Sequence, residues 1–211
     1  DPLITPYVAE FLLDARDAGF AIPDAVLQKA LQRLSEDLLT DSVQFYGRDD
    51  REYLKFAYKA YAGYVLARVN RAPLGTLRGL YDNDRGKTMR GLPLVHLGLA
   101  LSMQGDRVRG DRAIAEGFAF KPTHTGWVGD YGSPLRDMAL MIALCCYYNR
   151  LGILLACPPE YGFEKMANGP LGRLIGLAGP LTRHMLVRRQ RRSRTELTAS
   201  DALGTGPFGA V

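Results

Sequence analysis

The sequence predicts an all-α protein made of paired antiparallel helices in an α/α arrangement, a toroid or a solenoid, followed by an irregular basic C-terminal tail. Apolar residues recur at helical spacing along most of the first 150 residues, and no segment shows the sustained alternation of a strand. The helices come in pairs of about 40 residues joined by short loops, which is typical of antiparallel hairpins. Several helices are apolar over a wide arc, which favours a two-layered arrangement over a simple four-helix bundle.

The first predicted helix runs from Leu3 to Ala18. Thr5 can cap its start, Pro6 suits its first turn, and Gly19 can adopt the left-handed conformation that ends many helices. Its apolar stripe contains Ile4, Tyr7, Val8, Phe11, Leu12 and Ala15. We expect this stripe to face the core, so truncating Phe11 to alanine should cost about 2–5 kcal/mol.

Two longer helices follow. The second opens at Pro23 and runs to about Leu39; the third runs from Arg51 to Asn70, with Asp49 or Asp50 as its cap. The stripe of the second contains Val26, Leu27, Ala30, Leu31, Leu34 and Leu38. The stripe of the third contains Leu54, Ala57, Tyr58, Tyr61, Tyr64 and Val65.

The middle of the chain predicts a shorter helix from Pro73 to about Asp82, and then a polar link over residues 83–86. Residues 91–104 form a nearly wholly apolar helix, in which Leu99 is expected to be a core residue with the same cost of truncation as Phe11. Asp106 caps the next helix. The inward-facing residues of that helix are Val108, Ala113, Ile114, Ala115 and Phe118.

The stretch 129–144 predicts a turn that starts the last clear helix. Gly129 and Gly132 suit a tight turn, Ser133 can accept from orphan helix N–H groups, and Pro134 fits the first helical position. The helix is apolar on more than one side, so we expect several neighbours around it. Its apolar residues are Leu135, Met138, Leu140, Met141, Ile142 and Leu144.

Composition divides the chain into a body, residues 1–150, and a Gly/Pro/Arg-rich tail, residues 151–211. The body holds 19 Lys/Arg against 18 Asp/Glu and the tail 8 against 4, so most of the net charge of +5 belongs to the tail. The basic cluster Arg188–Arg194 could bind phosphates, but a solvated, poorly ordered tail is the expected state, and we expect no nucleic-acid partner. The longest apolar stretch, residues 138–157, is interrupted by Asn149-Arg150 and Gly152, so no transmembrane segment is expected.

Side chains able to do chemistry lack the partners that chemistry needs. His96 lies in an apolar helix with no second ligand at i±3 or i±4, and is expected to be a core histidine. His124 and His184 have no visible nucleophile partner, and Ser133 before a proline is a cap. Cys145, Cys146 and Cys157 show neither zinc nor disulfide spacing, and the first two are expected to be buried thiols. We therefore expect no enzyme, no catalytic, cofactor-binding or metal-binding residue, and no cofactor.

Two further groups have more than one interpretation. The tyrosines Tyr53, Tyr58, Tyr61 and Tyr64 of the third helix could form a docking surface, although aromatic residues at helical spacing more often belong to the core. An α/α-toroid glycosidase would need paired carboxylates at loop ends, for which Asp130 with Asp82 or Asp84 are the candidates, and nothing in the sequence pairs them.

Four segments resemble the bacterial alpha-2-macroglobulin family, in the right order over about residues 3–144. They read LITPYVAEFLLDARDAGFAIPDAVLQKAL, YAGYVLARVNRAPLGTLRGLYD, LPLVHLGLALSMQGDRVRGDRAIAEGF and GDYGSPLRDMALMIAL. The resemblance implies that residues 1–150 are the C-terminal part of a thioester domain, an α/α toroid. Because the chain opens at Asp1 in a helical pattern without an initiator Met, we expect it to be a fragment.

Members of this family are endopeptidase inhibitors of host defence, in which cleavage of a bait region exposes a thioester that captures the attacking proteinase. The resemblance implies target proteinases and neighbouring macroglobulin domains as partners of the full-length parent. It also implies a periplasmic, inner-membrane-anchored lipoprotein. The thioester usually joins the Cys and Gln of a Cys-x-Glu-Gln motif, which is absent here, so this fragment is expected to be the helical scaffold without the thioester.

Agreement with the family stops near Cys146, where Gly-Pro pairs and an Arg-rich run replace amphipathic helices. A displaced reading frame of GC-rich DNA would give this change, and a compact, protease-resistant tail would contradict that hypothesis. Residues 171–187 can still form a helix, interrupted at Gly179-Pro180. The alternative function is a tetratricopeptide-like scaffold that binds a partner peptide, because residues 98–118 resemble one such hairpin; its 34-residue period, however, is not repeated.

Overall fold

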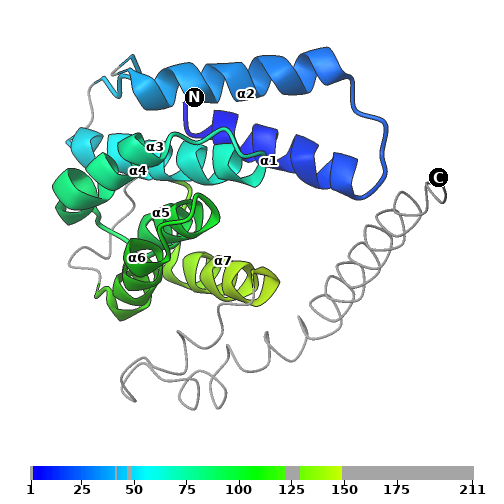
Figure 1. Cartoon of the computed structure of the whole chain (residues 1–211). Coiled ribbons are helices and arrows are strands. Elements are labelled where there is room, and N and C mark those ends of the chain that lie inside the picture. The colour runs from blue at the N-terminus through cyan, green and yellow to red at the C-terminus, as the bar shows by residue number, and fades with distance from the viewer. Residues whose placement is uncertain (1, 41, 47–48, 122–128, 149–211) are drawn as a thin grey trace, which may run out of the picture.

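A computed structural model of the chain describes residues 2–40, 42–46, 49–121 and 129–148, and the regular elements within these ranges are all helices (Figure 1). The all-α prediction is therefore confirmed for this part of the chain. The elements are α1 (Ile4–Asp17), α2 (Asp24–Leu39), α3 (Arg51–Arg68), α4 (Leu74–Gly79), the π-helical turn η1 (Leu80–Asp84), the 3₁₀ turn η2 (Arg85–Lys87), α5 (Leu92–Met103), α6 (Arg107–Ala119) and α7 (Pro134–Tyr147).

The odd-numbered helices form one layer and the even-numbered helices another. Helix α3 contacts α1 and α5, and α5 contacts α7, so α1, α3, α5 and α7 follow one another along an arc. The second layer covers this arc: α2 packs on α1 and α3, and α4 and α6 pack on α5 (Figure 1). The two-layered arrangement of helix pairs is the predicted one, while closure of the arc into a toroid stays a prediction.

Helix α5 is the centre of the core. Its residues 92–102 are all buried, because neighbours surround it on every side. Leu99 is 1% exposed, as predicted. Two glycines let α6 approach closely: a Cβ on Gly98 would lie 2.6 Å from the Gly110 carbonyl oxygen, and a Cβ on Gly110 would lie 2.1 Å from Ser102 Oγ. This close approach leaves no room for a methyl group on either side.

The predicted stripe of α1 is wrong. Phe11 is 60% exposed and Tyr7 is 61% exposed, whereas Ala9 and Leu13 are buried. The reason is that α1 packs mainly on α2 and α3, which cover the face with Ala9 and Leu13 and leave the face with Tyr7 and Phe11 largely exposed. Other residues predicted to face the core are also exposed, namely Ile4, Val8, Val26, Val108, Leu135 and Leu140.

Half of the predicted caps are confirmed. The side chains of Asp106 and Ser133 accept hydrogen bonds from the backbone N–H groups of the third residue of α6 and of α7 respectively. Gly19 has φ +91° after α1, as expected for a left-handed terminator. Thr5, in contrast, lies inside α1, which starts after Leu3 without a side-chain cap, and Asp50 precedes α3 without capping it.

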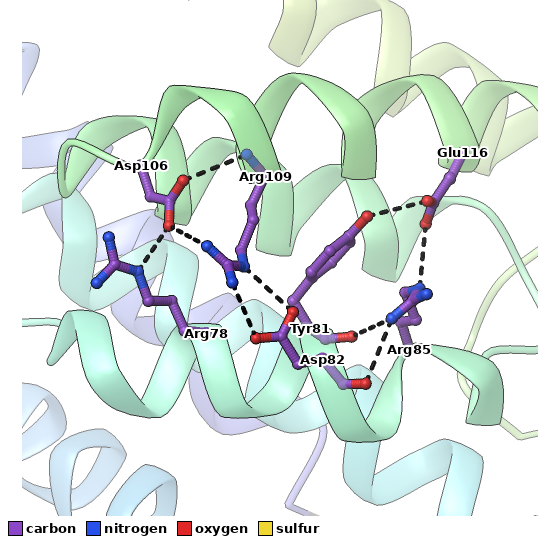
Figure 2. Close-up of polar contacts among 7 residues, drawn as sticks. All are labelled: Arg78, Tyr81, Asp82, Arg85, Asp106, Arg109 and Glu116. Atoms are coloured by element: carbon purple, nitrogen blue, oxygen red, sulfur yellow. Dashed lines mark hydrogen bonds and ion pairs between the residues drawn. The ribbon is translucent and has the colours of Figure 1, made fainter.

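The polar link predicted over residues 83–86 is helical instead. Helix α4 continues through η1 and η2, and α6 lies alongside it (Figure 2). The Arg85 guanidinium donates to the backbone carbonyls of Tyr81 and Asp82. Arg109 Nε on α6 lies 3.1 Å from Asp82 Oδ1. Side chains from a neighbouring helix thus stabilise a segment whose own composition is typical of a loop.

Several predictions fall outside the described residues. They concern His124, His184 and Cys157, the basic cluster Arg188–Arg194, and the interrupted helix over residues 171–187. The proposed displaced reading frame after Cys146 falls largely there too. Within the described part of the chain, no helix combines the length and hydropathy needed to cross a bilayer.

Candidate functional site

One pocket of about 430 Å³ lies where the N-terminal parts of α1, α3, α5 and α7 meet. We call it the helix-end pocket. Residues near the starts of these four helices, which form one layer of the fold, all line the pocket. The four helices therefore run parallel to one another, with their N-terminal ends together. Its apolar lining comes from Leu3, Ile4, Ala57, Leu92 and Pro93. Its aromatic lining comes from Tyr7, Tyr53, Tyr61, His96 and Tyr131.

A buried ion cluster forms the polar end of this pocket. Arg90 Nε lies 3.1 Å from Asp130 Oδ2, and Arg90 Nη1 lies 3.5 Å from Asp137 Oδ2. All three side chains are 9% exposed. The Tyr53 hydroxyl donates to Asp130 Oδ2, and the Gly132 N–H donates to Asp130 Oδ1 at 2.9 Å. One guanidinium therefore compensates two carboxylates, and Asp130 has donors on both oxygens.

Asp137 is less well satisfied than Asp130. Its Oδ1 is buried and accepts no hydrogen bond in the described structure, and the nearest cation, Arg136 Nη1, lies 3.6 Å away. Burial raises the pKa of Asp137, although the charge of Arg90 opposes this effect. Asp137 is also one of the residues that line the pocket.

The aromatic wall is a stack centred on His96. The His96 ring lies parallel to Tyr61, with centroids 4.4 Å apart, and next to Tyr64 at 5.2 Å. Burial, helped by the charge of Arg136, lowers the pKa of His96 to about 3. The imidazole is therefore neutral at physiological pH and serves as a flat wall, in agreement with its prediction as a core histidine.

The four tyrosines of α3 belong mainly to the core and end in polar partners. Tyr53, Tyr58 and Tyr64 are buried, whereas Tyr61 is half-buried and lines the pocket. The Tyr58 hydroxyl donates to Asp37 Oδ2 at 2.6 Å, and that of Tyr61 donates to Glu10. Burial and the adjacent carboxylates raise the pKa of Tyr53, Tyr58 and Tyr61. These contacts favour the core interpretation over a docking surface.

The cysteines and the candidate glycosidase carboxylates occupy positions in the helices and their ion pairs. Cys145 is buried and Cys146 half-buried in α7. Asp82 pairs with Arg109 and Asp84 with Lys87, whereas Asp130 lies in the ion cluster, so the contacts do not pair the carboxylates that a glycosidase would need. Among the described residues, no cluster of three or more His, Cys, Asp or Glu side chains could hold a metal ion.

Sequence reasoning missed the partnership of Arg90 with Asp130 and Asp137. The two carboxylates flank the cap of α7, which is a local signal, but Arg90 precedes Asp137 by 47 positions. No periodicity or motif relates positions so far apart. The pocket itself arises because helix starts from four separate segments meet.

The chain resembles proteins of one kind. It is 67% identical over 145 residues to the alpha-2-macroglobulin of Xylella fastidiosa, a match that covers 68% of this chain and 9% of that protein. It is 40% identical over 146 residues to the alpha-2-macroglobulin of Escherichia coli K12, covering 67% of this chain and again 9% of that protein. No protein-family model matches the chain.

The solved structures that resemble this chain are also of bacterial alpha-2-macroglobulins. Salmonella alpha-2-macroglobulin reacted with methylamine superposes with a TM-score of 0.68 at 35% identity, covering 76% of this chain and 10% of that one. Native E. coli alpha-2-macroglobulin, from domain MG7 to its C-terminus, gives 0.65 at 36% identity, covering 75% and 24% respectively. The chain is thus homologous to bacterial alpha-2-macroglobulins, and it spans about a tenth of the length of the curated relatives it matches.

Proposed function

We propose that residues 1–150 are the C-terminal part of a thioester domain in a bacterial alpha-2-macroglobulin-like proteinase trap. The observation that carries this proposal is the 67% identity over 145 residues to a bacterial alpha-2-macroglobulin. The two-layered arc of helix pairs supports it, because this is the local architecture that an α/α toroid requires. Residues 151–211 form a divergent tail.

The role of this segment is mechanical. Its helices form the scaffold that holds and presents a reactive thioester, and the segment supplies neither atom of that bond. Cys145 and Cys146 lie in the second half of α7 and are not followed by Glu-Gln, so they do not match the family's Cys-x-Glu-Gln motif. The Cys and Gln of the thioester therefore belong to another part of the parent protein.

The parent is a proteinase inhibitor and not an enzyme. It acts in the periplasm as an inner-membrane-anchored lipoprotein, and its partners are the proteinases that it captures and its own neighbouring macroglobulin domains. A tetratricopeptide-like scaffold is not favoured, because the similar proteins are all alpha-2-macroglobulins.

A chimera tests the proposal. Residues 3–147 of this chain replace the matching segment of E. coli alpha-2-macroglobulin, a protein whose trypsin-activated form has been solved. We expect the chimera to capture trypsin in a complex that survives denaturing electrophoresis, with the unaltered E. coli protein measured alongside it as the reference. Capture should disappear after pretreatment with methylamine.

A check of folding distinguishes a chimera that does not fold from one that folds and does not capture trypsin. The chimera is first shown to have the parent's size and helical circular dichroism. A chimera that folds and leaves trypsin uncaptured would overturn the scaffold role. A second chimera carrying Arg90→Met is the matched control, and we expect weaker capture because the ion cluster that joins α3, α5 and α7 is broken.

A further inference from the structure

The charges at the polar end of the helix-end pocket balance one another. Arg90 Nε lies 3.1 Å from Asp130 Oδ2, and Arg90 Nη1 lies 3.5 Å from Asp137 Oδ2. Arg136 Nη1 lies 3.6 Å from Asp137 Oδ1. Two guanidiniums therefore face two carboxylates. A charged ligand would leave water without finding an unpaired counter-charge among these residues, which costs free energy. The pocket therefore favours a neutral ligand.

The remaining lining suits a flat apolar ring. The volume of about 430 Å³ lies within the range of small-molecule sites, and Ala57, Leu92 and Pro93 supply apolar surface. Tyr61 and His96, whose rings lie parallel with centroids 4.4 Å apart, add an aromatic wall. Aromatic rings pack favourably against such a wall, either offset or edge-on. A rigid ring also loses little conformational freedom when it binds.

His96 is a polar group of this lining whose hydrogen-bonding capacity is unused. Its side chain is 7% exposed and lines the pocket. Within the part of the chain that the structure describes, its ring contacts Tyr61 and Tyr64 by stacking, and its nitrogens have no hydrogen-bond partner. Burial keeps the imidazole neutral by lowering its pKa to about 3, so it carries one N–H donor and one bare acceptor nitrogen. A ligand that hydrogen-bonds to this ring satisfies a buried polar group.

We propose that the helix-end pocket binds a small neutral phenol, with the ring beside the Tyr61–His96 stack and the hydroxyl hydrogen-bonded to a ring nitrogen of His96. A hydroxyl suits this imidazole because it can either donate to the bare nitrogen or accept from the N–H. The site belongs to the described part of this chain and does not depend on the thioester or on the proposed scaffold role.

Titration of the 211-residue chain with four single-ring probes, followed by NMR, tests the chemistry of the ligand. The probes are phenol, toluene, benzoate and benzylammonium; toluene replaces the hydroxyl by a methyl group of similar size. We expect phenol to bind with a Kd on the order of 1 mM, toluene about five- to tenfold more weakly, and the two ions not at all. Equal affinity for phenol and toluene, no binding of phenol, or an ion that binds as tightly as phenol would overturn the proposal.

His96→Phe tests the hydrogen bond, because it keeps a ring in the stack and removes both nitrogens. We expect phenol to bind this variant only as tightly as toluene does. Toluene is the control ligand, since its affinity should be the same for the variant and the wild type if the pocket is intact. A variant that binds toluene normally and still prefers phenol would contradict the role of His96.

Ala57→Leu tests the position of the ring. The larger side chain adds bulk to the apolar wall without altering charge and should abolish the binding of phenol. The exposed Ala119→Leu is its matched control and should leave phenol binding unchanged. Phenol binding that survives Ala57→Leu would contradict this placement even if His96→Phe fails to fold.

Discussion

Two of the arginine–carboxylate networks in the described part of the chain use the same residue types and differ in the exposure of their arginines. At the helix-end pocket, Arg90, Asp130 and Asp137 are each 9% exposed. Along the outer edge, Arg78 and Arg109 hold Asp106 and Asp82 between α4, η1 and α6 (Figure 2). Both arginines are more than a third exposed, although the Asp106 side chain between them is only 7% exposed. The two networks therefore differ mainly in the exposure of their arginines, which are buried at the pocket and reach water at the outer edge.

The pKa values of the two buried carboxylates shift in opposite directions. At the outer edge, the hydrogen bond from Arg78 at 2.6 Å is the main cause of a lowered pKa of Asp106. At the pocket, burial outweighs Arg90 and raises the pKa of Asp137. The comparison teaches that a cluster whose cation is buried is costly to disrupt, because its charges have no water to return to, whereas a network whose cations are exposed contributes little.

Replacing Arg90 with Met should give the largest effect. The variant leaves two carboxylates buried without their cation, so we expect the free energy of unfolding to fall by about 3–5 kcal/mol. Urea unfolding of the 211-residue chain, followed by circular dichroism, measures the loss. A loss no greater than that of Arg78→Met would show that the two networks are equivalent.

Replacing Gly110 with Ala should rank second and shows what joins α6 to α5. The added methyl would meet Ser102 Oγ and the Gly98 carbonyl, so we expect a loss of about 1–3 kcal/mol from overpacking. Gly75→Ala is the matched control in α4, where the added Cβ meets nothing within 4 Å, and it should stabilise the chain slightly. If both variants unfold alike, the packed seam between α5 and α6 is not a determinant of stability.

The pH dependence of stability should carry the signature of His96. The unfolded imidazole binds a proton below its ordinary pKa of about 6.5, whereas the folded one does so only near the lowered value of about 3. The contribution of the neutral His96 to the free energy of unfolding is therefore fully present above about pH 6.5. It is lost as the pH falls towards 3, by up to about 1.4 kcal/mol per pH unit. His96→Phe keeps a ring in the stack and should remove this slope.

The difference between wild type and variant isolates this group, because Glu10 and Asp137, whose pKa values are raised, titrate in both proteins. Unfolding midpoints in urea at several pH values between 4 and 8 supply the measurement. Parallel pH profiles for the two proteins would contradict the buried neutral imidazole.

Replacing Arg78 with Met should have the smallest effect. Its ion pair with Asp106 is partly exposed, and Asp106 keeps Arg109 as a second partner, so we expect a loss below about 1 kcal/mol. Raising the salt concentration should shrink this loss further while leaving that of Arg90→Met nearly unchanged. A loss as large as that of Arg90→Met, insensitive to salt, would mean that the outer network behaves as a buried one.

The features of this fold that depend on neighbouring residues in the chain were predicted correctly from the sequence. The caps at Asp106 and Ser133, the terminator at Gly19 and the wholly apolar α5 were all readable from the sequence, because their causes lie within a few residues. The helical state of residues 83–86 was not, because Arg109 on another helix supports it.

Burial and the pocket depended on information that the sequence does not display. Phe11 and Leu13 lie on the same helix and are both apolar, yet one is 60% and the other 1% exposed, since only the positions of α2 and α3 decide which face is covered. The pairing of Arg90 with Asp137 likewise required the fold. Helical periodicity identifies an apolar face without saying which neighbours reach it.

The DNA on both sides of the segment that encodes these residues provides the most direct test of the central proposal. If the chain is part of a proteinase trap, an in-frame macroglobulin-like sequence with a Cys-x-Glu-Gln motif should precede the codon for Asp1. A complete small open reading frame that encodes this helical chain alone would contradict the trap and favour a free-standing helical scaffold.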